Sequence, residues 1–268
     1  TSIHNLAYLY NSQGRYEEAE PLHLQALELR KKLLGNEHPD IASSINNLAY
    51  LYHSQGRYDE AELLYLQALA LLRKLLGNEH PDIATSIHNL AYLYNLQGRC
   101  EEAEPLLLQT LALWKKLFGH KHPNVATSIN NLAYLYNLQG RYEEAELLYL
   151  QALELRKKFL GNEHPDVANS INNLAYLYHS QGRYEEAELL YLQALELRKK
   201  FLGNEHPDVA NSINNLAALY DSQGRYEEAE PLYQQALELC EKLLGNEHPH
   251  TKIVRKNLEQ LRQDANGS

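Results

Sequence analysis

The chain has 268 residues, of which 44% are hydrophobic, and its formal net charge is −10 with a pI of about 5.7. This hydrophobic content suffices for a folded core, and no apolar run is long enough to span a membrane, so we expect a soluble, cytoplasmic protein. Lysine and arginine are interleaved with glutamate, which excludes the basic stripe that nucleic-acid-binding proteins present to phosphates.

A period of 42 residues organises the chain. One glycine series occurs within Gln-Gly-Arg, at Gly14, Gly56, Gly98, Gly140, Gly182 and Gly224, and a second runs through Gly35, Gly77, Gly119, Gly161, Gly203 and Gly245. Such self-similarity indicates an array of small units that bury their apolar faces only against their neighbours. The chain starts at Thr1 inside the first helix of this repeat and contains no methionine, so we expect a truncated first repeat and a fragment of a longer array.

Each repeat begins with a helix that follows a proline. In the repeat at 39–77, Pro39 suits a first helical turn because its fixed φ is helical and its missing N–H would be unpaired there. Gly56 and Arg57 interrupt the pattern. Between Pro39 and Gly56 lies one apolar stripe at spacings of three and four, formed by Ile45, Leu48, Ala49 and Tyr52.

A second helix completes the repeat and ends at Gly77, where we expect the left-handed conformation that closes helices. Its apolar stripe consists of Ala61, Leu64, Tyr65, Ala68, Leu69 and Leu72. The small residues Ala49 and Ala68 allow the two helices to approach closely as an antiparallel hairpin. Six stacked hairpins predict an all-α fold, a right-handed superhelical α-solenoid of helix-turn-helix repeats.

The end of the chain departs from the repeat. The segment 250–262 retains Leu258 and Leu261 but is otherwise polar on its outer side, as a capping helix requires. We expect a frayed tail after it. The predicted organisation is therefore a six-repeat array at 1–249, followed by a capping helix and short tail at 250–268.

The pattern resembles the tetratricopeptide repeat family. The residues that carry the resemblance are Leu48, Ala49, Tyr52, Gly56, Tyr58, Ala61, Tyr65 and Ala68, and they recur from Thr1 to about Pro249. The usual period of that family is about 34 residues. The longer second helix and the Gly-Asn-Glu-His-Pro loop account for the surplus, which makes the repeats similar to those of kinesin light chains.

A second stripe on the first helix of each repeat is polar and aromatic. One asparagine precedes each inward Leu-Ala pair: Asn5, Asn47, Asn89, Asn131, Asn173 and Asn215. The residue before each is His4, Asn46, His88, Asn130, Asn172 or Asn214. Three residues after each asparagine come Tyr8, Tyr50, Tyr92, Tyr134 and Tyr176, with Ala218 in the last repeat. These spacings place all three series on one face.

Two interpretations of this stripe remain open. The asparagines could bond a neighbouring helix and the tyrosines could pack between repeats. Alternatively, the resemblance implies that this stripe lines a concave groove, where asparagine can bond a peptide backbone and tyrosine adds rigid contact area. The stripe has no lysine or arginine in the six repeats, which disfavours a clamp for a C-terminal carboxylate.

These patterns favour a scaffold that binds an extended peptide or a partner surface, and we expect it to be a monomer. A ligand-sensing array attached to a nucleotide-switching signalling domain is an alternative, and a structural or engineered spacer is another. Fold-level analogy cannot choose among them.

The sequence lacks the patterns of an enzyme or cofactor site. It has no glycine-rich phosphate loop, nucleophile elbow or metal-ligating His-x-x-His spacing, so we expect a non-enzyme without cofactor or metal. The recurrent His-Pro-Asp at 38–40 resembles the tripeptide of J-domain co-chaperones only superficially and predicts a loop and helix start. Cys100 and Cys240 lie in different repeats, and we expect two ordinary thiols.

Overall fold

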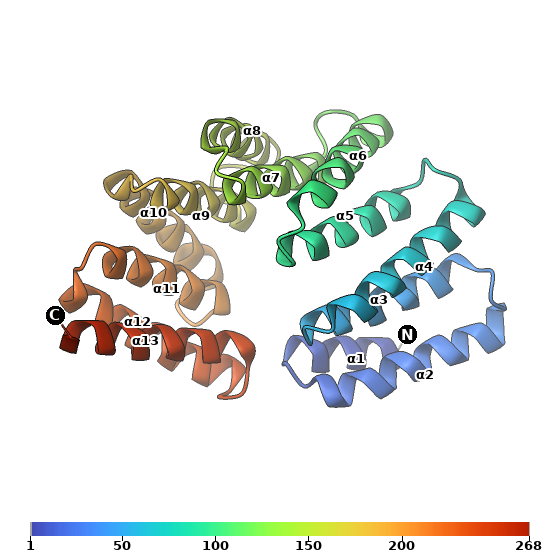
Figure 1. The fold of residues 1–268 in the computed structure, drawn as a ribbon, viewed down its shortest axis with the longest axis horizontal. Coiled ribbons are helices and arrows are strands. Elements are labelled where there is room, and N and C mark those ends of the chain that lie inside the picture. The colour runs from blue at the N-terminus through green and yellow to red at the C-terminus, as the bar shows by residue number, and fades with distance from the viewer. Residues whose placement is uncertain (1, 268) are drawn as a thin grey trace. The chain divides into compact units, whose positions relative to one another are not determined.

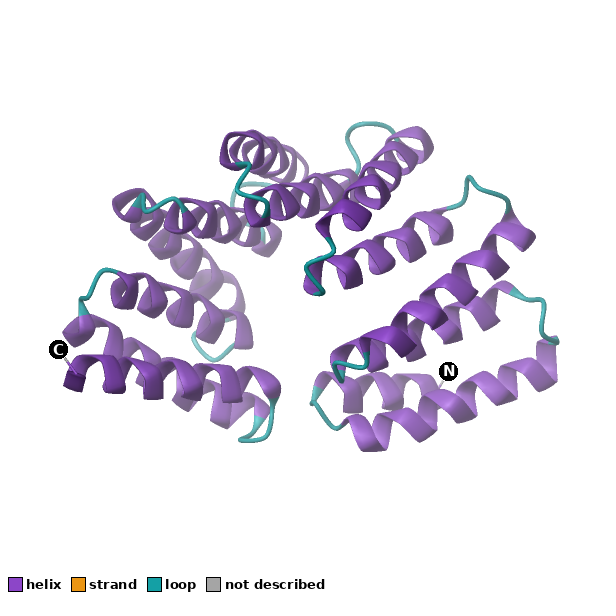
Figure 2. Cartoon of the chain, in the orientation of Figure 1, coloured by secondary structure: helices purple, strands orange, loops and turns teal. Residues whose placement is uncertain are grey.

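The computed structural model describes residues 2–267, and this part of the chain is helical with no strand (Figures 1 and 2). The helices in chain order are α1 Ser2–Ser12, α2 Tyr16–Leu34, α3 Pro39–Ser54, α4 Tyr58–Leu76, α5 Pro81–Leu96, α6 Cys100–Phe118, α7 Pro123–Leu138, α8 Tyr142–Leu160, α9 Pro165–Ser180, α10 Tyr184–Leu202, α11 Pro207–Ser222, α12 Tyr226–Leu244 and α13 Pro249–Gly267. Within the repeats, α1 packs with α2, α3 with α4, α5 with α6, α9 with α10 and α11 with α12 as antiparallel pairs, so the predicted all-α repeat solenoid is confirmed.

The structure divides into two compact units, 1–135 and 136–268, with the boundary inside α7. In the first unit α3 packs on α4 and α5 on α6, and in the second α9 packs on α10 and α11 on α12. Helix α13 packs against α12. It extends to Gly267, so the predicted tail at 264–267 is helical, and Ser268 lies outside the described residues.

Small residues bring the two helices of a repeat together. Ala49 of α3 and Ala68 of α4 are both fully buried, and Tyr65 beside them is 2% exposed. The second unit repeats this arrangement with Ala175 of α9 and Ala194 of α10. The predicted close contact therefore forms the core of each hairpin.

The predicted helix boundaries are confirmed, with one correction at the glycines. Pro39 occupies the first turn of α3, and Gly77 follows α4 with φ 77°. Its ψ of −168° lies outside the left-handed helical region that the sequence predicts. This extended conformation at positive φ is essentially restricted to glycine, so the glycine is required for a different conformation.

The histidine of the His-Pro-Asp loop caps the following helix. His38 Nδ1 accepts a hydrogen bond from the backbone N–H of Asp40 at 3.1 Å, and His206 does the same for Asp208 at 3.1 Å. These bonds satisfy a backbone donor that the helix itself leaves unpaired. The loop thus begins a helix, as predicted, and the histidine has a capping role that the sequence pattern did not reveal.

Candidate functional site

The polar stripe of the second unit is a ladder of hydrogen bonds between repeats. Asn215 of α11 donates through Nδ2 to Asn172 Oδ1 of α9 at 3.0 Å. The next rung joins Asn257 of α13 to Asn214 of α11 at 3.2 Å. Both rungs connect a residue to the one 43 positions later. Asn257 lies in the segment that departs from the repeat, so the pattern had not identified it as a member.

The first unit has the same ladder with histidine in some rungs. Asn47 Nδ2 of α3 lies 3.3 Å from His4 Nε2 of α1, and Asn131 Nδ2 of α7 lies 3.3 Å from His88 Nε2 of α5. Asn46 instead donates to Ser86 Oγ of α5 at 2.8 Å. Bonding to a neighbouring helix is therefore confirmed for these pairs.

The two polar series differ in exposure. Asn130, Asn172 and Asn214 are each 8% exposed, because they lie in the contact between consecutive first helices. The partners Asn47 and Asn215 are half-buried, as is Asn89. In these three repeats the asparagine directly before the Leu-Ala pair is therefore more exposed than the residue before it, whereas in the first unit Asn46 and His88 are half-buried as well. Ligand contact by these amides stays a prediction.

The tyrosines are the accessible part of the stripe. Tyr8 is 62% exposed, Tyr50 47%, Tyr92 43% and Tyr176 41%, whereas Tyr134 is half-buried. Large aromatic side chains with this exposure are available for contact with another molecule. They repeat with the period of the array, so each supplies an equivalent contact point.

Neutral histidines lie beside these tyrosines. The His53 ring of α3 lies 5.8 Å from the Tyr50 ring and 5.5 Å from the Tyr92 ring. His179 of α9 interacts through Nε2 with Ser222 Oγ at 2.9 Å. Burial lowers the pKa of both histidines, so they add no charge to the stripe near neutral pH.

Sequence reasoning missed a network that gives the Gln-Gly-Arg signature its role. Arg57 stacks over the Tyr52 ring at 3.7 Å and pairs with Glu20 of the preceding repeat at 2.9 Å. Tyr52 also donates its hydroxyl to Glu20 at 2.9 Å. The network recurs around Arg99, Arg183 and Arg225. The constant 37-residue spacing between this glutamate and its arginine was the available signal.

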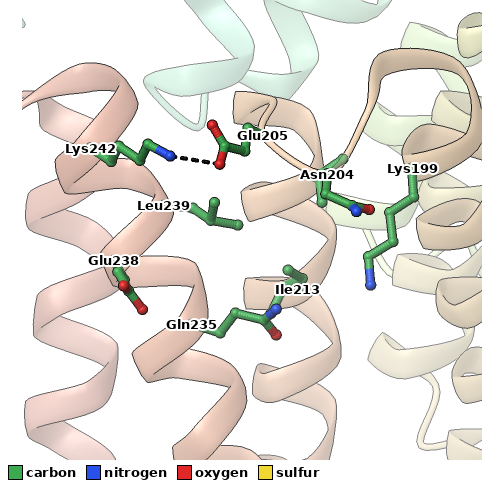
Figure 3. Close-up of a pocket in the computed structure, with 9 residues that line it drawn as sticks. Lys199, Asn204, Glu205, Ile213, Gln235, Glu238, Leu239 and Lys242 are labelled. Carbon is green, nitrogen blue, oxygen red and sulfur yellow. Dashed lines mark hydrogen bonds and ion pairs between the residues drawn. The ribbon is translucent and has the colours of Figure 1, made fainter.

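A pocket of about 390 Å³ lies away from the stripe, in the second unit (Figure 3). Leu239 and Ile213 lie between its charged edges, and Lys242 pairs with Glu205 across one side at 2.6 Å. Gln235 completes the lining from α12. Positive and negative side chains balance at its rim, so the pocket has no charge preference that would identify a ligand.

The sequence expectations also concern metal ligands, membrane-spanning helices and cysteines. Within residues 2–267 no three histidine, cysteine, aspartate or glutamate side chains gather as metal ligands, and no helix there has the length and apolarity to cross a bilayer. Both cysteines are free thiols. Cys240 lies in the core near His250 Nδ1, at 3.4 Å, and burial raises the pKa of its thiol.

Paired antiparallel helices with a periodic exposed stripe define the class of this protein as an α-solenoid repeat protein. The chain belongs to the tetratricopeptide repeat family, whose pattern matches residues 1–74, 49–111, 82–158, 148–200, 166–242 and 208–267. Its repeats are of the 42-residue, kinesin light chain-like type, as the sequence predicts.

Solved structures agree with this assignment. A kinesin light chain-like protein of Podosopora anserina with nearly identical TPR-like repeats is 34% identical, with a TM-score of 0.61, and the match covers 77% of this chain and 97% of that one. BtubC (BKLC) from P. vanneervenii is 28% identical, with a TM-score of 0.67 and coverage of 87% and 94%. NprR, solved with its cognate peptide NprX, shares the fold at 18% identity and a TM-score of 0.67, over 97% of this chain and 72% of NprR.

Proposed function

We propose that this chain is a non-catalytic interaction scaffold that binds an extended segment of a partner protein along the first helices of its repeats. The observation that carries the proposal is the row of exposed tyrosines at one position of successive repeats, including Tyr50, Tyr92 and Tyr176. Membership of the tetratricopeptide family and the peptide complex of NprR support it. A cytoplasmic location and a monomeric state belong to the same proposal.

The chemistry of the stripe suits a backbone-directed interaction. Tyrosine offers a flat apolar ring and a hydroxyl, so it contacts many side chains and bonds backbone groups at low entropic cost. Asn47 and Asn89 lie three residues before Tyr50 and Tyr92, on the same helix face. Their half-buried side-chain amides can accept a hydrogen bond from a peptide N–H. Since the stripe carries almost no charge, binding should depend only modestly on salt.

The test removes two tyrosines from the first unit. We expect Tyr50→Ala with Tyr92→Ala to weaken binding of a peptide selected from a display library by roughly one to two orders of magnitude, because each ring contributes about 1–2 kcal/mol. The melting temperature should change little, since both rings are more than 40% exposed.

The matched control is Leu63→Ala on the second helix α4. Leu63 is 68% exposed and should leave affinity unchanged. Equal losses for the tyrosine pair and for Leu63, or selected peptides that bind the tyrosine variant normally, would contradict the proposal. A display library that yields no binding peptide would favour a spacer.

A further inference from the structure

One position of the second helix reaches the start of the next repeat. In α10 this position is Arg198, which is 4% exposed. Its guanidinium donates to the Asp208 carbonyl oxygen at 3.0 Å, to Ser212 Oγ at 2.6 Å and to Asn169 Oδ1 at 2.7 Å. Three polar groups from α9 and α11 therefore form a receptor for a planar donor group.

Two of these three acceptors, the carbonyl and the serine, bind an arginine in two further repeats. Arg30 of α2 donates to the Asp40 carbonyl oxygen at 3.0 Å and to Ser44 Oγ at 2.7 Å. Arg156 of α8 donates to the equivalent carbonyl and serine groups at 3.2 and 2.7 Å. Fixed fork geometry makes arginine suited to such multiple acceptors.

In α6 the equivalent residue is Trp114, and a cavity of about 170 Å³ lies beside it. The cavity is lined by Trp114, Thr85, His88, Asn124, Thr127 and Ser128, all within the first unit. Three of these correspond by the repeat to the groups that bind Arg198, namely Thr85, Asn124 and Ser128. The receptor wall is thus retained in a repeat whose own second helix supplies no guanidinium to it.

The wall also keeps its internal geometry. Ser128 is 1% exposed and donates to the Asn124 carbonyl oxygen at 2.8 Å, just as Ser44 donates to the Asp40 carbonyl oxygen at 3.0 Å beside Arg30. In the arginine repeats the serine oxygen simultaneously accepts from the guanidinium. The Ser128 oxygen therefore offers the same acceptor to the cavity.

We propose that the Trp114 cavity binds the guanidinium group of an arginine side chain supplied by a partner. Phe118 and His122 stack with the indole at ring-centroid distances of 5.6 and 6.2 Å, so the planar cation would lie against the part of the indole that lines the cavity. Tryptophan is the strongest cation–π acceptor among side chains, and the cation would also donate to Ser128 Oγ and the Asn124 carbonyl. An apolar cavity of about 150 Å³ accommodates benzene, so a guanidinium with its adjoining methylene fits here.

The electrostatics of the cavity agree with this ligand. The chain has a net charge of −10, which attracts cationic partners. Burial lowers the pKa of His88, so this ring is neutral near pH 7 and does not repel a cation. His88, which lines the cavity, also interacts with Asn131 of the polar stripe at 3.3 Å, so the cavity and the stripe share this residue. Only the source of the arginine, a bound peptide, rests on the proposed function.

Nuclear magnetic resonance tests this directly, because Trp114 is the single tryptophan and its indole N–H gives one resonance. The full chain is titrated with N-acetyl-arginine amide, with the lysine analogue, and with the citrulline analogue, which keeps the shape and lacks the charge. We expect saturable shifts of the indole resonance with arginine, at least tenfold tighter than with the other two. Absence of a shift, or equal binding of citrulline, would overturn the proposal.

Two variants that keep Trp114 sharpen the test. Asn124→Asp restores the aspartate of the arginine repeats and should tighten arginine binding about fivefold or more. Ser128→Ala should weaken it by a similar factor, while the matched control Ser212→Ala, at a wall already filled by Arg198, should leave it unchanged. If Asn124→Asp and Ser128→Ala both leave affinity unchanged, the wall does not bind the ligand and the assignment is wrong.

A final arm identifies the source. Replacing arginine by citrulline in a stripe-binding peptide should weaken that peptide at least tenfold; an unchanged affinity, with arginine amide still bound, would assign the cavity to free arginine and overturn the partner-supplied side chain. The variant Tyr50→Ala with Tyr92→Ala should retain the response to arginine amide, so failure of the stripe and failure of the cavity are distinguishable.

Discussion

His23 is a buried titratable residue at a position where four other second helices have tyrosine. It is 3% exposed, and burial, with a smaller contribution from the nearby His4, lowers its pKa to about 4. The folded-state pKa lies below the unfolded value of about 6.5. The stability that neutral His23 contributes is therefore fully present above pH 6.5 and is lost as the pH falls towards 4.

Replacing this histidine should flatten the acid dependence of stability. We expect His23→Leu, which copies Leu107 of α6, to remove about 2–3 kcal/mol of the destabilisation between pH 7 and pH 4, since each pKa unit is worth about 1.4 kcal/mol. Urea unfolding at both pH values measures this. An identical pH dependence in the two proteins would show that His23 does not titrate as assigned.

The bonds of the asparagine ladder should contribute to the stability of the fold. Asn215→Ala leaves the Asn172 oxygen, in a side chain only 8% exposed, without its donor. We expect a loss of about 1–3 kcal/mol in the free energy of unfolding. The exposed Asn5 is the control, and Asn5→Ala should cost far less. Similar small effects for both would mean that the rung contributes no stability.

At the scale of helices, the Arg-Tyr-Glu network couples one repeat to the next. Glu188 of α10 accepts from Tyr220 at 2.8 Å and from Arg225 at 2.9 Å, and these two groups belong to the following hairpin. Burial and the bond to Glu188 raise the pKa of Tyr220 to about 12. Its contribution to stability is thus complete below about pH 10 and lost as the pH rises towards 12.

Breaking this network should loosen the junction between repeats. We expect Glu188→Ala to cost about 1–2 kcal/mol, more than an isolated surface pair, because one carboxylate bonds two partners. Glu227→Ala, at an exposed glutamate of the neighbouring α12, is the matched control. Thermal unfolding compares them, and equal melting temperatures would contradict the coupling role.

Local chemistry explains why the helices could be predicted. Pro39 acts through its fixed φ and Gly56 through its freedom to adopt a positive φ, and the three-and-four spacing of apolar residues fixes which face is buried. Partners from other repeats could not be deduced in this way. The bond between Asn172 and Asn215 and the pairing of Glu188 with Arg225 depend on the stacking of hairpins, which the spacing within one helix does not specify.

The sequence shows which residues depart from the repeat, but it does not show what structural role they have. Trp114 stands where three repeats have arginine and two have Leu72 or Cys240, and only the geometry around Arg198 shows that this position faces an acceptor wall. The wall is assembled from the first helices of two consecutive repeats, so no single stretch of sequence contains its pattern. The residues of the candidate stripe, in contrast, lie on one face of the first helix in each repeat, so their spacing alone predicted them.

At the scale of the whole molecule, an array of near-identical hairpins should gain stability with each repeat. We expect a chain that ends at Gly161 to remain helical by circular dichroism but to unfold at a lower urea concentration than the full chain. A random-coil spectrum from the shortened chain would contradict nearest-neighbour stabilisation.

The proposed function requires that partners bind along the first helices. Hydrogen–deuterium exchange with and without a selected peptide tests this most directly, because it reports each helix separately. We expect added protection in α3 and α5 around Tyr50 and Tyr92, or in α9 around Tyr176, with the outer faces of α4 and α10 unchanged. Protection confined to the second helices, or none at saturating peptide, would contradict it.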